Sequence, residues 1–169
     1  MSKTDFETFC QMAKEMCATH AKVISPQSVI TAAWVRLKCQ YGCGGYGRRL
    51  TCPPYSPTPE ETRKVLDSYE HAILLRGNSN AEAGDAAVKL EREIFLCGYY
   101  KAFAFGSGPC RHCQQCDTSQ TCKHPYKARP AMEASGIDVF QTARNNGFPI
   151  EVVTSREQQG DYYGLVLIN

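Results

Sequence analysis

The sequence lacks any long apolar run. No stretch of its 169 residues approaches the roughly 20 consecutive apolar residues that a membrane-spanning helix needs. The first ten residues include acidic side chains and have no continuous apolar core, so we expect no secretory signal peptide there. These absences predict a cytoplasmic protein without a membrane partner, in a compartment where free thiols persist.

The sequence also lacks a strong charge of either sign. Nineteen Lys and Arg residues against 17 Asp and Glu residues leave a formal charge of +2, without the basic stripe of a nucleic-acid-binding module. Nucleic acid is therefore not expected as a partner. No internal repeat or linker stands out, and 43% of the residues are apolar, so we expect one domain over residues 1–169 with its own hydrophobic core.

What the sequence has in excess is cysteine. Ten cysteines are too many for a cytosolic protein unless some of them hold metal. A disulfide framework would also use them, but nothing in the chain indicates an oxidising compartment. Seven of the ten fall in two segments, residues 39–52 and 110–122.

The second segment carries the clearest spacing. Cys110, Cys113 and Cys116 are separated by two-residue gaps, and Cys122 follows after five residues. This spacing favours a cubic [4Fe–4S] cluster, because such a run wraps three corners of the cube and a remoter thiolate closes the fourth. In the bacterial ferredoxin pattern the fourth cysteine comes sooner and directly precedes proline. Zinc is the alternative, although its four-thiolate sites usually split into two separated pairs.

The first segment holds Cys39, Cys43 and Cys52 with glycines between them, whose flexible backbone lets amide groups point at sulfur or at another anion. Three thiols are one short of a full set, and three interpretations stay open. Cys97 or Cys10 could supply the fourth ligand of a second cluster. One iron could instead be open to a substrate, or the thiols could only pack.

Four side chains near these thiols are candidates for binding a small anionic substrate: Tyr41, Arg48, Arg49 and Tyr55. The two arginines could also offset the charge of a cluster, or simply form a solvated turn. A nucleotide-binding loop is not indicated, since no Lys-Ser or Lys-Thr pair follows the glycines. Beyond the second segment, His124 could neighbour a cluster or act as an alternative ligand.

Hydrophobic periodicity and turn residues indicate an α/β fold, with a central mixed β-sheet flanked by helices. Helices are expected over residues 4–20, 59–69, 83–100 and 136–146. Strands are expected over residues 29–37, 71–76, 102–105, 149–153 and 162–168. Each cysteine segment follows an expected strand, so we expect the metal loops at the carboxyl ends of strands. Cys10, Cys17 and Cys97 are expected to pack in the core.

Several segments together resemble a known family. They are residues 36–43, the Cys-Pro-Pro motif that begins at Cys52, the run Cys110–Cys122 and residues 128–139, which include Gly-Ile-Asp-Val. In these, the chain resembles the cysteine-rich predicted metal-binding proteins of anaerobic bacteria and archaea, a domain family of unknown function. The resemblance extends from about Trp34 to the end of the chain. It implies metal binding and an anaerobic or redox setting, and no particular reaction.

Three functions follow as hypotheses. The first is a protein with one or two [4Fe–4S] clusters that exchanges electrons with a redox partner protein. The second is an enzyme that uses an open iron at Cys39, Cys43 and Cys52 as a Lewis acid on a small anionic substrate. The third is a binding module stabilised by zinc.

Overall fold

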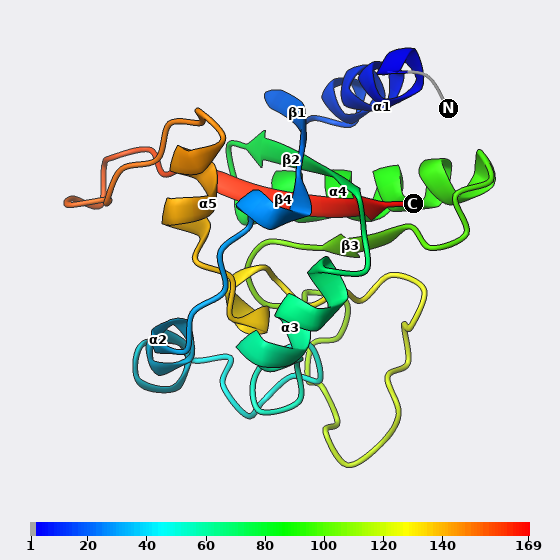
Figure 1. Cartoon of the computed structure of the whole chain (residues 1–169). Coiled ribbons are helices and arrows are strands. Elements are labelled where there is room, and N and C mark those ends of the chain that lie inside the picture. Colours follow the sequence, from blue (N-terminus) through cyan, green and yellow to red (C-terminus); the bar gives the residue numbers. More distant parts are fainter. Residues whose placement is uncertain (1–2) are drawn as a thin grey trace.

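The computed structural model describes residues 3–169, and side chains from Phe6 onward; Met1 and Ser2, which open the segment considered for a signal peptide, lie outside that range. A four-stranded antiparallel sheet lies at its centre, in the order β1-β2-β4-β3 (Figure 1). The strands are β1 (His20–Ile24), β2 (His71–Gly77), β3 (Phe103–Phe105) and β4 (Tyr162–Ile168). The α/β class is confirmed, whereas the expectation of a mixed sheet is wrong, because every described pair of strands is antiparallel.

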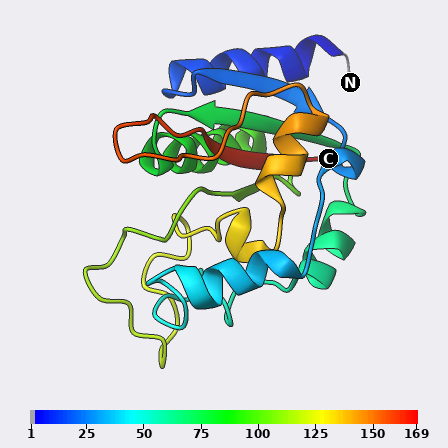
Figure 2. The ribbon, with the colours of Figure 1, turned by 90° about the vertical axis from the view of Figure 1, so that its left-hand side faces the viewer.

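Two layers of helix and loop cover the two faces of the sheet. Alternate side chains of a strand point to opposite faces, so in β2 Ile73 and Leu75 face one layer while Ala72 and Leu74 face the other. The first layer contains α1 (Lys3–Glu15) and α4 (Asn80–Leu96). The second contains α3 (Pro59–Leu66), the short η2 (Glu133–Ser135) and α5 (Val139–Asn145), and Figure 2 shows the sheet between the layers.

The start of α3 follows directly from its sequence. The Thr58 hydroxyl accepts from the Glu61 amide at 3.1 Å, and the Glu61 carboxylate accepts from the Thr58 amide at 2.8 Å. This reciprocal capping satisfies amides that the first helical turn leaves without partners. Pro59 occupies the first helical position, where its missing N–H costs nothing. The predicted helix from Pro59 is therefore confirmed, although it ends at Leu66 rather than near residue 69.

The strand predicted over residues 29–37 is wrong. The segment Val29–Ala33 makes only an isolated bridge, Thr31 with Ile137, and the chain then enters α2 (Trp34–Gly42). The β-branched residues at its start suggested a strand, but the edge position beside β2 is taken by β1, which sequence reasoning missed. Of the α2 side chains Val35 is buried, and the helix contacts η2.

Other expectations fail at the ends of elements. Residues 149–153 form a loop before β4 rather than a strand, and within it Ile150 packs in the core while residues 151–153 are exposed. The first helix ends at Glu15, so Cys17 is exposed, with a positive φ of 77°. Cys97 is likewise exposed, beyond the end of α4. Of the three cysteines expected in the core, Cys10 is the one that lies there.

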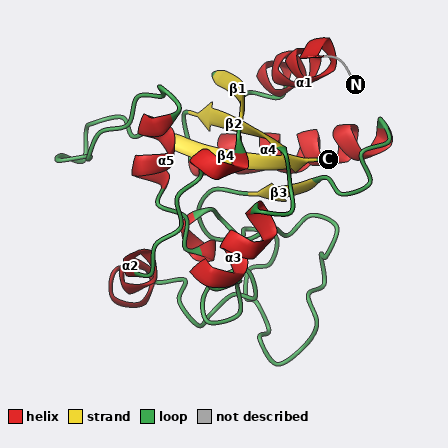
Figure 3. Ribbon diagram, viewed as in Figure 1, coloured by secondary structure: helices red, strands yellow, loops and turns green. Residues whose placement is uncertain are grey.

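Both cysteine segments lie beyond the β3 edge of the sheet (Figures 1 and 2). Residues 107–130 form one long loop without helix or strand, as Figure 3 shows. The ends of this loop are joined, because Gly106 pairs with Ala131 in a parallel bridge and the Gly106 amide donates to Pro130 at 2.8 Å. The loop follows β3 as predicted, but the other cysteine segment follows α2 instead of a strand. In the described residues, no helix has the length and apolar character needed to cross a bilayer.

The packing of α4 on β4 makes Gly164 a sensitive position. A Cβ added there would lie 2.9 Å from the Ala83 carbonyl oxygen and 3.0 Å from Ala87 Cβ. We expect Gly164→Ala to lower the free energy of unfolding by about 1–3 kcal/mol, because the helix must shift from the sheet. Urea unfolding followed by circular dichroism measures this loss. The matched control is Gly42→Ala, where no atom lies within 4 Å and stability should change by less than about 1 kcal/mol. Equal stabilities of the two variants would contradict this account of the packing.

Candidate metal centre

The long loop folds its four cysteines around one small cavity. The cavity has a volume of about 20 Å³, and its walls include Cys110, Cys113, Cys116, Cys122, His112 and His124. All four thiols are partly buried. Residues that lie up to twelve positions apart in the sequence therefore line the same cavity.

Two histidines and a backbone amide also lie beside the four cysteines. The His124 amide donates to Cys122 Sγ at 3.4 Å. The imidazole rings of His112 and His124 lie with their centroids 5.8 Å apart, and His112 Nε2 is 3.2 Å from the Lys127 carbonyl oxygen. Sequence reasoning identified His124 as a possible neighbour and missed His112, although His112 lies within the cysteine run.

An ion pair fixes the return of this loop to the sheet. Arg129 contacts Glu91 of α4 through two bonds, Nη2 to Oε1 at 2.6 Å and Nε to Oε2 at 2.8 Å. Their side chains are only 15% and 13% exposed. Glu91 also accepts from the Ala104 amide of β3, and Arg129 donates to the carbonyls of Pro125 and Ala128. The end of the cysteine loop, α4 and β3 are thus joined at one carboxylate.

The other three cysteines line a second, much larger cavity of about 530 Å³. Cys39 lies on α2, Cys43 follows its last residue, and Cys52 is buried in the loop beyond. A Cβ on Gly45 would lie 3.3 Å from Cys52 Sγ and 3.6 Å from Cys43 Sγ, and the Gly45 amide donates to Cys43 Sγ at 3.4 Å. The lack of a side chain at Gly45 therefore lets its backbone lie against both sulfurs, as the glycines in this segment suggested.

The loop that carries Cys52 is attached to its surroundings by polar contacts. Arg36 Nη2 donates to the carbonyls of Ser56 at 2.7 Å and Pro57 at 2.8 Å. The Ser56 hydroxyl donates to the Ala134 carbonyl. The loop is thereby held to α2 on one side and to η2 on the other, which keeps Cys52 close to Cys39.

Burial favours the protonated form of two of these thiols, Cys39 and Cys52. It raises the pKa of Cys39 to about 11, with a further contribution from the negative charge of Cys43. Burial also raises the pKa of Cys52, and the negative charge of Cys43 adds to that rise. Metal ligation needs the thiolate, so binding at this site would release protons.

The two groups of cysteines are neighbours. Cys110 lies close enough to Cys52 for its charge to raise the pKa of that thiol, and Pro109 Cβ lies within 3.6 Å of the Cβ position of Gly45. Neither sequence candidate for a fourth ligand lies there: Cys10 packs in the core beside α4, and Cys97 is exposed beyond its end. Among the described thiols outside the group of three, Cys110 is the one whose charge acts on Cys52.

The side chains predicted to hold an anion lie elsewhere. Tyr41 and Tyr55 are exposed, and neither is among the described residues that line the 530 Å³ cavity. Arg48 and Arg49 line a separate polar hollow of about 510 Å³, together with Gly44, Gln114, Gln115, Cys116 and Thr118. Arg49 also lines the small cavity of the 110–122 loop, and its charge acts to lower the pKa of Cys52. The arginines therefore adjoin the cysteines, although neither lines the large cavity.

Two other polar residues near the group of three were missed. Lys38 and Glu133 both line the large cavity, and Cys39 Sγ lies 3.9 Å from the Glu133 carbonyl oxygen. Protein atoms around the Glu133 carboxyl displace part of its water, and this desolvation raises its pKa. The side chain as a whole is exposed to solvent on the cavity side. The only sequence signal for them was position: Lys38 precedes Cys39, and Glu133 lies in a segment that carries the family resemblance.

The chemistry of the donors fits an iron–sulfur cluster. Each group of cysteines offers thiols only, and in each a backbone amide donates to a sulfur, as in protein sites that tune such clusters. Within residues 3–169, no three His, Cys, Asp or Glu side chains are close enough to hold a single metal ion. The fit therefore depends on the donor atoms and not on the cavity, whose volume of about 20 Å³ is near that of a single water site. Cys110, Cys113, Cys116 and Cys122 would hold one cluster, and Cys39, Cys43 and Cys52 would provide three ligands to another.

The ion pair at Glu91 predicts a stability effect. We expect Glu91→Ala to lower the free energy of unfolding by about 3–5 kcal/mol, because it leaves Arg129 charged, largely buried and without its carboxylate. The matched control is Glu157→Ala, an exposed residue in the loop before β4, which should be neutral. Chemical denaturation of both variants measures the difference. A Glu91→Ala protein as stable as the control would show that the ion pair does not hold the loop.

Comparison with known proteins supports metal binding by this chain. The search of curated proteins and the search of solved structures each gave no match. A family described as predicted metal-binding protein (DUF2284) matches residues 22–168. This range contains both groups of cysteines, the two histidines of the small cavity and all of the sheet except the first two residues of β1. The chain therefore belongs to the DUF2284 family of predicted metal-binding proteins.

Proposed function

We propose that this protein carries one or two [4Fe–4S] clusters and transfers electrons to or from a partner enzyme in the reducing, anaerobic interior of a cell. One observation carries the proposal: the four thiols of residues 110–122 line a single cavity. An extended segment of this length could hold the same thiols far apart. A cluster of this kind needs four thiolates around one centre and supplies reversible one-electron chemistry.

Two features favour a cluster over zinc. The four thiols come from one continuous loop, whereas four-thiolate zinc sites usually combine two separated pairs. Backbone N–H groups donate to Cys43 and Cys122, and such hydrogen bonds stabilise negative charge on cluster sulfur and raise the reduction potential. Zinc undergoes no redox change, so a protein that holds zinc would be a binding module and not an electron carrier. Metal analysis distinguishes these two alternatives.

The position of the two groups supports electron transfer through the protein. The charge of Cys110 acts on Cys52, and Pro109 packs against Gly45 of the other segment, so two clusters held by these groups would be neighbours. The large cavity adjoins Cys39, Cys43 and Cys52, while the run from Cys110 lies in an exposed loop. Electrons would enter at the exposed loop and reach the cluster beside the cavity.

A surface for a redox partner adjoins the exposed loop. The polar hollow of Arg48 and Arg49 includes Cys116 in its wall. None of the four ion pairs among the described residues involves Arg48 or Arg49, so their charges are available to a partner. Positive charge next to the entry point would attract an acidic surface and speed its association.

A second candidate function is enzymatic. Cys39, Cys43 and Cys52 supply three thiols to a centre that needs four, and they form part of the wall of a cavity large enough for a small molecule. A cluster with one iron open would act there as a Lewis acid. In this alternative Cys52→Ser abolishes turnover and leaves the spectrum of the other cluster intact.

The cluster assignment predicts a defined loss of iron. In protein purified without oxygen, we expect Cys113→Ser to reduce iron and acid-labile sulfide by about four atoms each per chain, because it removes one ligand of a four-thiolate cluster. The control is Cys17→Ser, which changes an exposed thiol outside both groups and should leave both counts unchanged. Iron, sulfide and zinc analysis with the visible spectrum provides the measurement. Stoichiometric zinc without sulfide in the wild-type protein would contradict the proposal.

The arginine hollow predicts how the charge of a reductant affects the rate. At low ionic strength we expect Arg48→Glu to slow reduction by dithionite roughly 10-fold and to speed reduction by reduced methyl viologen, since one reductant is an anion and the other a cation. Salt should weaken both effects. The matched control is Arg156→Glu, an exposed charge in the loop before β4, and stopped-flow absorbance measures the rates. Equal effects of the two substitutions would show that electrons do not enter beside Arg48.

A further inference from the structure

We propose that the 530 Å³ cavity is a binding site for an uncharged, mainly apolar small organic molecule, held against the Cys39, Cys43 and Cys52 group. Its volume lies within the range of about 300–1,000 Å³ that small-molecule sites occupy. The proposal goes beyond electron transfer, because it gives the protein a ligand of its own. It rests in part on the proposed function, because the ligand would lie beside a cluster held by these three cysteines.

The walls of the cavity are chiefly apolar. Aliphatic and aromatic side chains come from α2, the segment between η2 and α5, α5 itself and the loop before β4, among them Trp34, Ile137, Phe140, Val152 and Val153. Several of these are strongly exposed on this face: Trp34 by 47%, Val152 by 62% and Val153 by 46%. Covering such a surface with an apolar ligand gains about 25 cal/mol for each Å² removed from water. Exposed apolar side chains that gather around a hollow therefore indicate a binding site.

The charges around the cavity disfavour an anion. Lys38 is its one cation among the described lining residues, against the carboxylates of Glu133, Asp138, Glu151 and Asp161. Two of these carboxylates have partners: Asp161 pairs with Arg76, and Asp138 accepts from the Gln141 amide at the start of α5. Thiolates at Cys39, Cys43 and Cys52 would add further negative charge. The arginines that suggested a small anion from the sequence lie in the other hollow.

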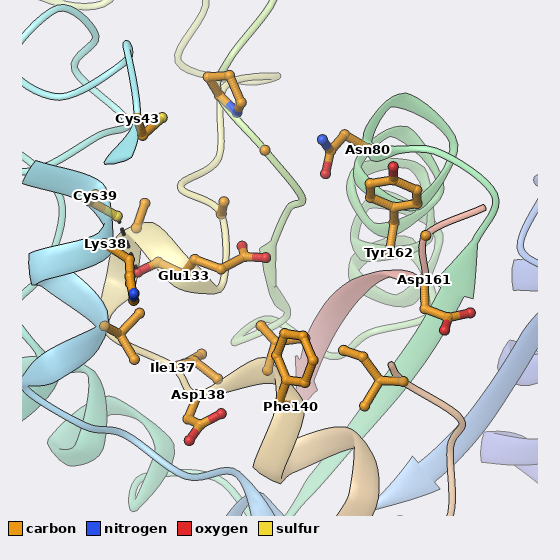
Figure 4. Close-up of a pocket in the computed structure, with 18 of the residues that line it drawn as sticks. Lys38, Cys39, Cys43, Asn80, Glu133, Ile137, Asp138, Phe140, Asp161 and Tyr162 are labelled. Atoms are coloured by element: carbon orange, nitrogen blue, oxygen red, sulfur yellow. Dashed lines mark hydrogen bonds between the residues drawn. The ribbon is translucent and has the colours of Figure 1, made fainter. Parts of the chain in front are cut away.

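A few polar groups at the two ends would orient the ligand. Figure 4 shows Lys38, Cys39 and Cys43 at one end, Asn80 and Tyr162 at the other, and Glu133 between them. The Asn80 carboxamide is fixed, because its oxygen accepts from the Ser107 hydroxyl at 2.7 Å, and its nitrogen would lie 2.9 Å from a Cβ on Gly108. Such a site, apolar along its length with polar groups at its ends, matches the usual composition of small-molecule pockets. A ligand filling its length would reach from the sheet to the cysteines.

A pair of probes with the same ring system tests the proposal: naphthol, which is uncharged at neutral pH, and naphthalene sulfonate, which is an anion. Titration calorimetry on the anaerobically purified protein should show one naphthol bound per chain, with a negative heat-capacity change from apolar burial. Naphthol should bind at least about tenfold more tightly than the sulfonate, a difference of roughly 1.4 kcal/mol. Equal affinities, or a preference for the sulfonate, would overturn the proposal.

Matched variants locate the binding. Val153→Asp places a charge in the cavity wall and should weaken naphthol binding at least about tenfold, since the carboxylate must be desolvated or the ligand displaced. Val65→Asp changes an exposed valine on α3 outside the cavity, and Arg48→Glu changes the other hollow; both should bind naphthol like the wild type. If Val153→Asp binds as well as Val65→Asp, the cavity is not the site. Iron and sulfide counts on the same samples report separately on the clusters, so failure of one proposal is distinct from failure of the other.

Discussion

The ion pair between Arg129 and Glu91 is the interaction on which the arrangement of the metal loops depends. It lies where the 110–122 loop returns to the sheet, and the same carboxylate also accepts from the Ala104 amide of β3. The loop has no helix or strand of its own, so its shape depends on contacts at its two ends and on whatever the thiols bind. A largely buried ion pair is costly to break from one side, which makes it an effective anchor for a segment without helix or strand.

The second group of cysteines is positioned differently, by direct packing against the first. Gly45 fits between Pro109 and the sulfurs of Cys43 and Cys52, and the Arg36 contacts hold the rest of that loop to α2. The antiparallel sheet contributes no residue to the small cavity that the other four thiols share, and instead gives both loops a rigid edge to adjoin. This division, a rigid sheet with functional residues in loops beyond its edge, is common where a site must change ligands or oxidation state without disturbing the core.

The two hollows on either side of the cysteines differ in chemistry, and that difference organises the proposed function. The hollow of Arg48 and Arg49 is polar and positively charged, which suits an acidic protein surface. The large cavity beside Cys39 is apolar and bordered mainly by carboxylates, which suits an uncharged organic molecule. Electrons delivered at the first hollow would pass the adjacent clusters toward a molecule held in the second.

The sequence by itself determined the local features: the capped start of α3, the buried strand β2, the helix α4 and the two groups of cysteines with their glycines. These depend on residues close together in the chain, so their spacing carries the information. Tertiary structure decided what depends on distant partners. The β-branched segment from Val29 found no strand to pair with because β1 occupies the edge beside β2, and so it leads into α2. The nearness of Cys52 to Cys110, the separation of Arg48 from the large cavity and the roles of Lys38 and Glu133 likewise arise from packing between segments far apart in sequence, which no local pattern encodes.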